Sequence, residues 1–350
     1  MVKEKIAIVT GSDGLVGSEA VKFFSKKGFK IIGIDNNSRK KFFGDDASIL
    51  KNRKILKSTV SNYIHLNLDI NSEKITDIFK KHGDNVKLVI HAAAQPSHDW
   101  AASNPRLDFN VNAYGTLNLL ENTRIYSKDA VFIYTSTNKV YGDNPNKLKY
   151  KELKKRYSPI NSFIKKNGID ENFSIDNTLH SLFGVSKLSA DVLTQEYGKY
   201  FDMKTVSFRG GCLTGGGHAG TELHGFLSYL VKCLMYENSY TIFGFKGKQV
   251  RDNIHSSDLI KCFYEFYKKP RLGEVYNIGG GVYSNCSMLE AIEISENLIG
   301  KKLNYKYIDK TRKGDHQWYV SDLSKFKSHY PNWKISLGIT DILEDIVKNT

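Results

Sequence analysis

Cysteine is scarce in this chain, and its placement argues against a framework built on thiols. The four cysteines are Cys212, Cys233, Cys262 and Cys286, all in the C-terminal half, and none forms a Cys-x-x-Cys pair. Without such spacing we expect neither a set of disulfides nor a zinc knuckle. Reduced thiols are typical of a reducing compartment, so the sequence predicts a cytoplasmic protein.

Long apolar segments are missing as well. No stretch approaches the roughly 18–20 apolar residues that a membrane helix needs, so we expect no association with a membrane. The first five residues, Met-Val-Lys-Glu-Lys, run directly into a strand-like segment without the apolar region or cleavage site of a signal peptide. With 350 residues, of which 40% are hydrophobic, the chain can instead bury a large core and carry a second lobe.

Arginine is much rarer than lysine. The formal net charge is +14, yet only nine of the 51 basic residues are arginines, and the lysines are spread over predicted helices and loops. A nucleic-acid-binding surface usually concentrates arginines and stacking aromatic residues in one patch. We therefore interpret the charge as a solvated lysine-rich surface and predict no nucleic-acid partner. Such a surface favours the encounter with an anionic small molecule.

Strand-like and helix-like patterns alternate through the first part of the chain. Short apolar strand patterns occur at residues 6–9, 29–35, 63–69, 87–91 and 130–134. Helix-length segments such as residues 113–124 separate them. Repeated βαβ units give a parallel sheet with right-handed crossovers and helices on both faces. The predicted fold class is therefore α/β, a doubly wound parallel sheet of the Rossmann type with a smaller C-terminal lobe.

Two segments depart from this regular alternation. Residues 39–62 are lysine-rich and weakly periodic, which predicts an extended loop with a short helix. Residues 143–177 are long and polar, which predicts an excursion over the active site, because long loops of this kind are commonly functional.

A glycine-rich turn follows the first strand and opens the first helix. Gly11, Gly14 and Gly17 have GxxGxxG spacing, and Asp35 follows 18 residues later at the end of the second strand. The glycines permit a tight turn, a close approach to a pyrophosphate and close helix–strand packing. The N–H groups at the start of the helix then face the anion. This combination predicts a dinucleotide site.

The strand ends define the rest of this site. Asp35 should bind the adenosine ribose hydroxyls and repel a 2′-phosphate, which favours NAD over NADP, although Arg39 nearby could accept a phosphate. Asp69 and Ile70 end the third strand, where an adenine ring would lie. The small residues 92–94 end the fourth strand and let a dinucleotide lie across the carboxyl edge of the sheet.

Several longer motifs extend the pattern along nearly the whole chain. They are the Ala-Ala-Ala strand end, Asn112 with residues 115–121, Ser-Thr-Asn-Lys-Val-Tyr-Gly-Asp at 136–143, Gly-Lys-Gln-Val-Arg-Asp at 247–252, and Tyr-Asn-Ile-Gly-Gly at 276–280. With them the chain resembles the extended short-chain dehydrogenase/reductases of the NAD-dependent epimerase/dehydratase family. The motifs at 136–143 and 247–252 are most similar to those of the CDP-paratose 2-epimerases, also called CDP-tyvelose epimerases.

The resemblance implies a chemistry and a domain plan. Such enzymes keep NAD bound, oxidise one carbon of a nucleotide-linked sugar to a ketone, and return the hydride to its other face. We expect residues 1–207 to form the NAD-binding domain, with 246–278 returning to it, and residues 208–350 to form mainly the substrate-binding lobe. The family also implies a homodimer through helices near 113–124 and 188–200.

The expected cofactor contacts combine the turn, the strand ends and two residues carried over from the family. They are Gly11, Gly14, Leu15, Val16, Gly17, Asp35, Asn36, Asn37, Arg39, Asp69, Ile70, Ala92, Ala93, Ala94, Asn112 and Lys187.

The catalytic positions show one departure from the family pattern. Thr137 matches the hydroxyl residue that bonds the reacting sugar oxygen, and Lys187 matches the lysine that holds the nicotinamide ribose. The tyrosine expected four residues before that lysine is Phe183, which has no proton to exchange. General acid–base catalysis typically contributes about 10²–10⁴-fold, so its loss should be severe unless another group acts.

Three explanations of Phe183 stay open. His98, after the fourth strand, could take the proton, since histidine titrates near neutral pH; His180 and Cys212 are weaker candidates. Thr137 and Lys187 could suffice with a water relay. The protein could also have lost redox chemistry and kept only ligand binding, a hypothesis that the number of retained motifs argues against.

The substrate is expected at the far end of the cofactor. The resemblance carries over six contacts, namely Gln95, Asp99, Asn138, Arg251, Arg312 and Asp315. Arginine suits a diphosphate because its planar fork meets phosphate oxygens in pairs, and Asp315 should orient Arg312 or meet a ribose. His218 and His224 lack metal-ligand spacing, so we predict no metal. A dehydratase is disfavoured, because Asn138-Lys139 replaces the family's Asp-Glu.

Overall fold

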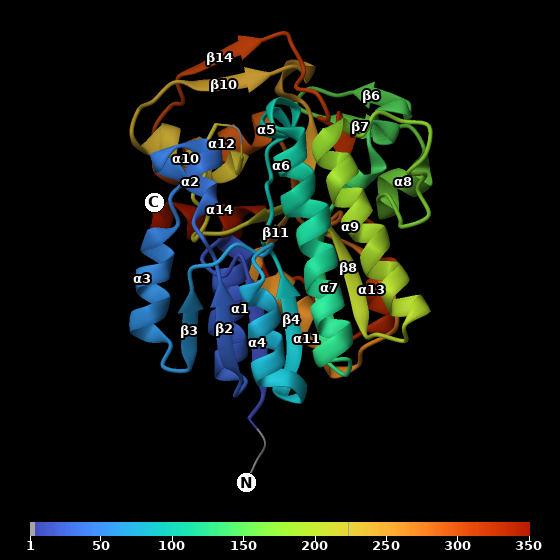
Figure 1. Ribbon diagram of the computed structural model, residues 1–350. Helices are drawn as coiled ribbons and strands as arrows, with labels where there is room; N and C mark the ends of the chain where they lie inside the picture. Colours follow the sequence, from blue (N-terminus) through green and yellow to red (C-terminus); the bar gives the residue numbers. More distant parts are fainter. Residues whose placement is uncertain (1–3, 223) are drawn as a thin grey trace.

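The computed structural model describes residues 4–222 and 224–350, and its centre is a seven-stranded sheet (Figure 1). The strands run in the order β12-β8-β5-β4-β1-β2-β3, and every neighbouring pair is parallel. Their bounds are β1 (Ile6–Thr10), β2 (Lys30–Ile34), β3 (Tyr63–Leu66), β4 (Val86–His91), β5 (Val131–Thr137), β8 (Thr205–Gly210) and β12 (Glu274–Ile278). The predicted α/β fold with a doubly wound parallel sheet is confirmed.

Helices cover both faces of this sheet (Figure 1). One face is covered by α1 (Leu15–Lys26), α3 (Leu50–Thr59), α11 (Ser256–Lys268) and α13 (Ser324–His329), and the other by α4 (Lys74–His82), α7 (Gly115–Tyr126) and α9 (Ser181–Tyr200). No helix among the described residues is long and apolar enough to cross a membrane.

The first strand shows why the sheet is buried on both sides. Ala7 and Val9 pack with α1 and α11, whereas Ile6 and Ile8 pack with α4 and α7. Successive side chains of a strand point to opposite faces, so an uninterrupted Val/Ile run is what a strand covered on both sides requires.

A second, smaller part lies above the carboxyl edge of the sheet (Figure 1). Its strands are β9 (Cys212–Thr214), β11 (Val250–His255), β13 (Asn285–Ser287) and β15 (Trp318–Tyr319) in one sheet, and β10 (Tyr240–Phe243) with β14 (Tyr305–Ile308) in another. Its core is formed by α10 (Phe226–Met235), α12 (Met288–Ile299) and α14 (Ile339–Asn349).

Residues 246–278 are divided between the two parts. β12 pairs with β8 at one edge of the large sheet, and α11 packs on the face that α1 covers. β11 instead pairs with β9, β13 and β15 in the smaller sheet.

The prediction for residues 39–62 was wrong. This segment forms α2 (Ser38–Phe43), a short 3-10 turn and the ten-residue helix α3 rather than an extended loop. Leu56 is the one buried residue of α3, and Arg53 forms an ion pair with the buried Asp13. A helix held by one apolar residue and one ion pair shows little apolar periodicity.

The prediction for residues 143–177 was also wrong in position. These residues form the hairpin β6 (Tyr150–Glu152) and β7 (Tyr157–Pro159), followed by α8 (Ser162–Asn167). The segment is held against the second part, where Tyr157 N donates to Lys248 O at 3.0 Å and Ile169 N to Val320 O at 2.8 Å. All of residues 143–177 are described, and none of them lines the pocket below.

Candidate active site

One large pocket lies between the carboxyl edge of the seven-stranded sheet and the second part. Its cavity is about 510 Å³. It is bordered by the glycine turn, by the ends of β2, β4 and β5, and from the second part by residues 210–214, 217–219 and 312–315. Ligands of doubly wound sheets bind at this edge.

The glycine turn supports one end of the pocket. Gly11 has a φ of +65°, and its N–H donates to Ile34 O at 2.8 Å. A Cβ at Gly17 would lie 2.0 Å from Gly11 O, so the helix can approach the turn only without a side chain there. Leu15, Val16 and Gly17 line the pocket in the first turn of α1, where N–H groups lack helical partners. This end fits a dinucleotide pyrophosphate.

Asp35 lies beside the turn and faces the pocket. Its carboxylate accepts from Asp13 N at 3.1 Å and from Asn37 N at 2.8 Å. Burial, and secondly the charge of Asp13, raise the pKa of Asp35 to about 6. An acid that faces the pocket here suits ribose hydroxyls and opposes a 2′-phosphate.

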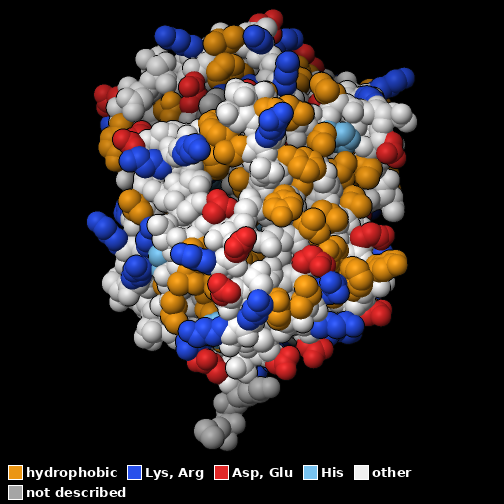
Figure 2. Space-filling view, viewed as in Figure 1, with side chains coloured by type: hydrophobic (Ala, Val, Ile, Leu, Met, Phe, Trp, Pro, Cys, Tyr) orange, Lys and Arg blue, Asp and Glu red, His pale blue; other side chains and the backbone are white. Residues whose placement is uncertain are grey.

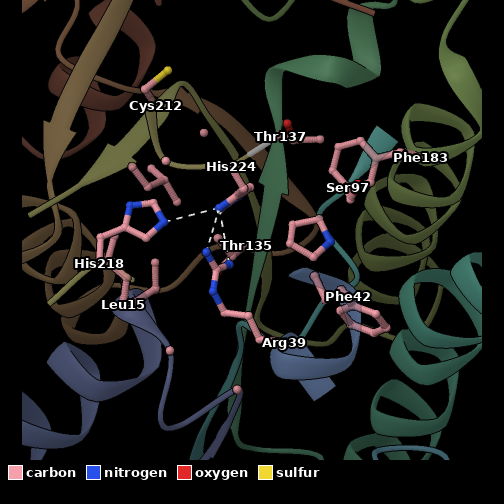
Figure 3. A pocket seen from close by; sticks show the side chains of 18 of the residues that line it. Leu15, Arg39, Phe42, Ser97, Thr135, Thr137, Phe183, Cys212, His218 and His224 are labelled. Atoms are coloured by element: carbon pink, nitrogen blue, oxygen red, sulfur yellow. Dashed lines mark hydrogen bonds between the residues drawn. The ribbon is translucent and has the colours of Figure 1, made fainter. Parts of the chain in front are cut away.

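Arg39 and Asn37 are engaged differently from the prediction. An Arg39 Nη atom donates to Ala219 O at 2.7 Å, and both Nη atoms lie 3.3 Å from His224 Nδ1 (Figure 3). Arg39 therefore lines the pocket while bridging α2 to the second part. Asn37 does not line the pocket, because its side chain bonds Ile49 N at 3.1 Å and Ser48 Oγ at 3.4 Å.

The other strand-end residues lie where the sequence predicted them. Asn36, Asp69, Ile70 and residues 92–94 all line the pocket, and Asn36 Nδ2 donates to Asp69 Oδ2 at 3.1 Å.

Gln95 and Asn112 do not line the pocket, which corrects their predicted contacts with substrate and cofactor. Both side chains are buried. Gln95 N donates to Asn112 Oδ1 at 2.9 Å, and Asn112 Nδ2 donates to Gln95 O at 3.0 Å. Gln95 Nε2 also donates to Asp108 Oδ1 at 2.7 Å. These amides hold the loop after β4 beneath the pocket, because a buried polar group needs its partners.

Thr137, Lys187, Phe183 and His98 all line one end of the pocket. Thr137 Oγ1 accepts from Lys139 N at 3.3 Å. Lys187 Nζ donates to Thr135 O at 2.8 Å and lies 4.3 Å from the centre of the Tyr134 ring. Burial lowers the pKa of Lys187 to about 7.

His98 lies directly against Phe183, with their ring centres 4.9 Å apart. His98 Nδ1 is hydrogen-bonded to Ser181 Oγ at 2.9 Å. Burial, and secondly the charge of Lys139, lower the pKa of His98 to about 3, so the ring is uncharged at neutral pH. The weaker candidates are less suited, since His180 does not line the pocket and burial raises the pKa of the Cys212 thiol to about 11.

Several of the predicted substrate residues adjoin this group, because Asp99 follows His98 and Asn138 follows Thr137. Asp99, Asn138, Arg251, Arg312 and Asp315 all line the pocket. Asp315 forms an ion pair with Arg251, not with Arg312 as one prediction had it. Arg312 instead donates to Glu222 O at 3.1 Å, with its guanidinium 4.1 Å from the centre of the Phe243 ring.

Comparison with known proteins supports this arrangement. Residues 7–279 match the model of the NAD dependent epimerase/dehydratase family. The chain belongs to this family. It is 33% identical over 327 residues to the CDP-paratose 2-epimerase of Salmonella typhi, covering 91% of each chain. It is 27% identical to the UDP-glucuronate 4-epimerase of Thermodesulfobacterium geofontis, covering 97% of this chain and 94% of the other.

A solved structure shows the same fold. It is a Tyr-to-Phe mutant of UDP-glucuronic acid 4-epimerase from Bacillus cereus, in complex with UDP-4-deoxy-4-fluoro-glucuronic acid and NAD. The TM-score is 0.78 at 24% identity, and the match covers 98% of both chains. As a member of the NAD-dependent epimerase/dehydratase family, the chain is an NAD-dependent enzyme of the epimerase type, and its glycine turn and Asp35 fit that cofactor.

Among the pocket residues of this epimerase-family chain to which the sequence assigned no role is Lys139. Lys139 lines the pocket, and its Nζ donates to Gly314 O at 2.9 Å. A usable signal was present, since Lys139 follows Thr137 by two residues. Thr137 ends β5, a short 3-10 turn, η4 (Asn138–Tyr141), follows directly, and both residues line the same cavity. Among residues 4–222 and 224–350, no group of three or more His, Cys, Asp or Glu side chains is placed to hold a metal ion.

Proposed function

We propose that this protein is an NAD-dependent epimerase of a nucleotide-diphosphate sugar, specifically a 2-epimerase of a CDP-sugar that acts by transient oxidation to a keto-sugar. The preference for CDP and for the 2-position is supported by the 33% identity with the Salmonella typhi CDP-paratose 2-epimerase. We also infer that it acts in the cytoplasm, since all four cysteines are free thiols.

One observation carries the proposal. A single cavity connects the glycine turn and Asp35 with Thr137 and Lys187, and these with Arg251 and Arg312. The cavity could therefore take a dinucleotide at the glycine turn and a sugar nucleotide at the arginines, with Thr137 and Lys187 facing the reacting groups.

The chain's own residues then have distinct tasks. NAD, when bound, supplies the acceptor and later the donor of a hydride. The Thr137 hydroxyl can hydrogen-bond the reacting sugar oxygen. Lys187, fixed on Thr135 O, can hold the nicotinamide ribose. Holding reactants in near-attack geometry removes much of the entropic barrier.

Two arginines suit the diphosphate. Arg251 is 9% exposed and held by Asp315, so its guanidinium is oriented before substrate arrives. Arg312 is fixed by the Phe243 ring and by Glu222 O. One guanidinium group can bind two phosphate oxygens at once. This suits the diphosphate of a sugar nucleotide, whatever its base.

Phe183 favours a second candidate, a protein that binds NAD and a sugar nucleotide without turning it over. A phenyl ring cannot exchange a proton, and the neighbouring His98 is a weak base because burial lowers its pKa to about 3. A dehydratase or net dehydrogenase is less well supported, because the residues after Thr137 are Asn138 and Lys139 rather than two acids.

The direct test uses purified protein, its bound dinucleotide identified, with a panel of CDP-, GDP- and UDP-sugars followed by mass and proton NMR. We expect an isomer of unchanged mass from one CDP-sugar. Loss of water would instead identify a dehydratase, and a net oxidation a dehydrogenase. Tight binding of a sugar nucleotide without any product would favour the second candidate, a binding protein without catalytic activity.

We further propose that two copies of the chain form a homodimer through α7 and α9. Figure 2 shows hydrophobic side chains gathered on the side of the molecule where α6 (Pro105–Phe109), α7 and α9 lie. The exposed apolar residues there are Phe109, Tyr114, Ile125, Val185 and Val192. A patch of this kind on a soluble enzyme commonly marks a protein interface.

Replacing Val185 and Val192 together by Glu is expected to convert the dimer to a monomer, because charges would be buried without partners at the interface. Sedimentation velocity measures the change. Val282→Glu, at an apolar residue that is 55% exposed outside this patch, serves as the control and should leave the sedimentation unchanged. A wild-type chain that sediments as a monomer at all concentrations would contradict the proposal.

A further inference from the structure

Lys139 is a pocket lysine to which the family resemblance assigns no role. It lies on η4, directly after the strand that carries Thr137. Its Nζ donates to Gly314 O, which is the one hydrogen-bond acceptor it meets in residues 4–222 and 224–350. A lysine ammonium can donate three hydrogen bonds, and a neutral amine has a lone pair that can accept a proton. Nζ can therefore still bond a group in the cavity.

The surroundings of Lys139 connect it with the place of the missing tyrosine. A Cβ at Gly314 would lie 2.8 Å from His98 Cε1, so Gly314 packs against that ring. The His98 ring in turn contacts Phe183. From the other side, a Cβ at Gly184 would lie 3.0 Å from Lys139 O. Lys139 and Phe183 therefore border the same corner of the pocket.

Burial of the Lys139 side chain favours an amine that titrates near neutral pH. Burial lowers the pKa of Lys139 to about 8, opposed in part by the charge of Asp315. The titratable and charged groups that face it are Asp315, Arg251, Cys212, Asp143, His98 and His316. Asp315 forms its ion pair with Arg251, although its charge, like that of Asp143, still acts on the lysine.

The other candidates are less suited to carry a proton. His98 Nδ1 is already bonded to Ser181 Oγ, and its pKa is far below neutral. Lys187 Nζ is fixed on Thr135 O, at the position from which it would hold the nicotinamide ribose. The Thr137 hydroxyl can relay a proton but cannot retain one.

We propose that the amino group of Lys139 is the acid–base group of this enzyme and takes the proton that a tyrosine at position 183 would otherwise take. The inference rests on the proposed epimerase function. The neutral amine accepts the proton of the sugar hydroxyl as the same carbon loses a hydride to the family's nicotinamide cofactor. The O–H and C–H bonds break while the N–H bond and the ketone form. When hydride returns to the opposite face, the ammonium gives the proton back to oxygen, so atoms and electrons balance.

The first test compares Lys139→Ala with wild type, using CDP-paratose as the probe. We expect the turnover number to fall by at least about 100-fold, the lower end of what acid–base catalysis contributes. Added methylamine should restore part of the loss. Lys147→Ala is the matched control, because that lysine also bonds a single carbonyl, Asn177 O, but is exposed. Turnover within threefold of wild type would overturn the inference.

The pH dependence gives a second readout. Because the amine must be neutral to accept a proton, kcat/KM of the wild type should rise with pH through about 8 and then level off. The Lys139→Ala variant should lose this rise, and methylamine should move it toward its own higher pKa. An unchanged profile in the variant would contradict the assignment.

A third readout does not need turnover. The rate at which fluorodinitrobenzene labels Lys139, followed by peptide mass spectrometry against pH, reports the pKa of the amine. A midpoint near 8 supports the inference, whereas one near the ordinary 10.5 overturns it. If wild type converts no sugar in the panel, the proposed function fails. If wild type turns over and Lys139→Ala does so equally, only this inference fails.

Discussion

Replacing Gly17 by Ala is expected to remove bound NAD from the purified protein. A Cβ at this position would lie 2.0 Å from Gly11 O and 2.7 Å from Gly11 C, both of which are backbone atoms that cannot rotate away. The helix must then shift from the turn that holds the pyrophosphate. Overpacking of this kind typically costs about 1–3 kcal/mol and displaces the backbone. The measurement is the amount of NAD released per chain on denaturation.

Gly338→Ala is the control for this change. Gly338 precedes α14, far from the glycine turn, and the nearest atom to an added Cβ there is Asp341 Oδ2 at 3.5 Å, an ordinary contact. We expect this variant to retain NAD as wild type does. Equal NAD contents in Gly17→Ala and Gly338→Ala would contradict the account of the turn.

The second large effect concerns a buried ion pair close to Thr137. Arg209 on β8 meets Asp191 on α9 through two bonds of 2.9 and 3.2 Å, and also donates to Tyr141 Oη at 3.1 Å. Ser136, the neighbour of Thr137, donates to the same carboxylate at 2.6 Å. Arg209→Met leaves Asp191 buried without its partner and should lower the free energy of unfolding by about 3–5 kcal/mol.

Two further variants make this result specific. Replacing both partners, Arg209→Met with Asp191→Leu, should be less destabilising than Arg209→Met alone, because no unpaired charge remains. Lys302→Met removes an ion pair with Glu296 whose lysine side chain is 87% exposed, and should change stability by less than about 1 kcal/mol. Urea unfolding measures all three. Equal losses for the buried and the exposed pair would show that the buried one is not needed.

The elements of the fold that the sequence predicts are those with a regular pattern of apolar residues. The inner strands β1, β4 and β5 contain apolar runs rich in Val and Ile, because a parallel strand covered on both faces needs them. Helix α3 has no such apolar pattern, because a single buried residue, Leu56, and the Arg53–Asp13 ion pair hold it in place. A contact between residues 40 positions apart leaves no local pattern.

The site shows the same division. Backbone requirements, such as those of Gly11 and Gly17, can be predicted from spacing, because only glycine meets them. The direction in which a polar side chain points cannot be predicted from spacing. Gln95 and Asn112 lie in the expected segments but bond one another beneath the pocket. Asp315 pairs with Arg251 rather than Arg312, a choice made by how β11 and the 312–315 loop pack together.

The identity of the proton carrier depends on packing in the same way. The sequence left three explanations of Phe183 open, and in one of them His98, which follows the fourth strand, takes the proton. Burial makes that imidazole a weak base, whereas the same enclosure brings Lys139 near neutral titration. A pKa set by desolvation is a property of the folded environment and has no counterpart in the local sequence.

We propose that the reacting carbon is oxidised by hydride transfer and reduced again within one active site. The most direct measurement converts CDP-paratose carrying deuterium at the C2 carbon and follows the label in the product by mass and NMR. The account predicts an epimer that retains the deuterium at the inverted carbon, because the hydride leaves and returns without exchange. An epimer that has exchanged its deuterium for solvent hydrogen would contradict it, since proton abstraction at carbon would then have replaced hydride transfer.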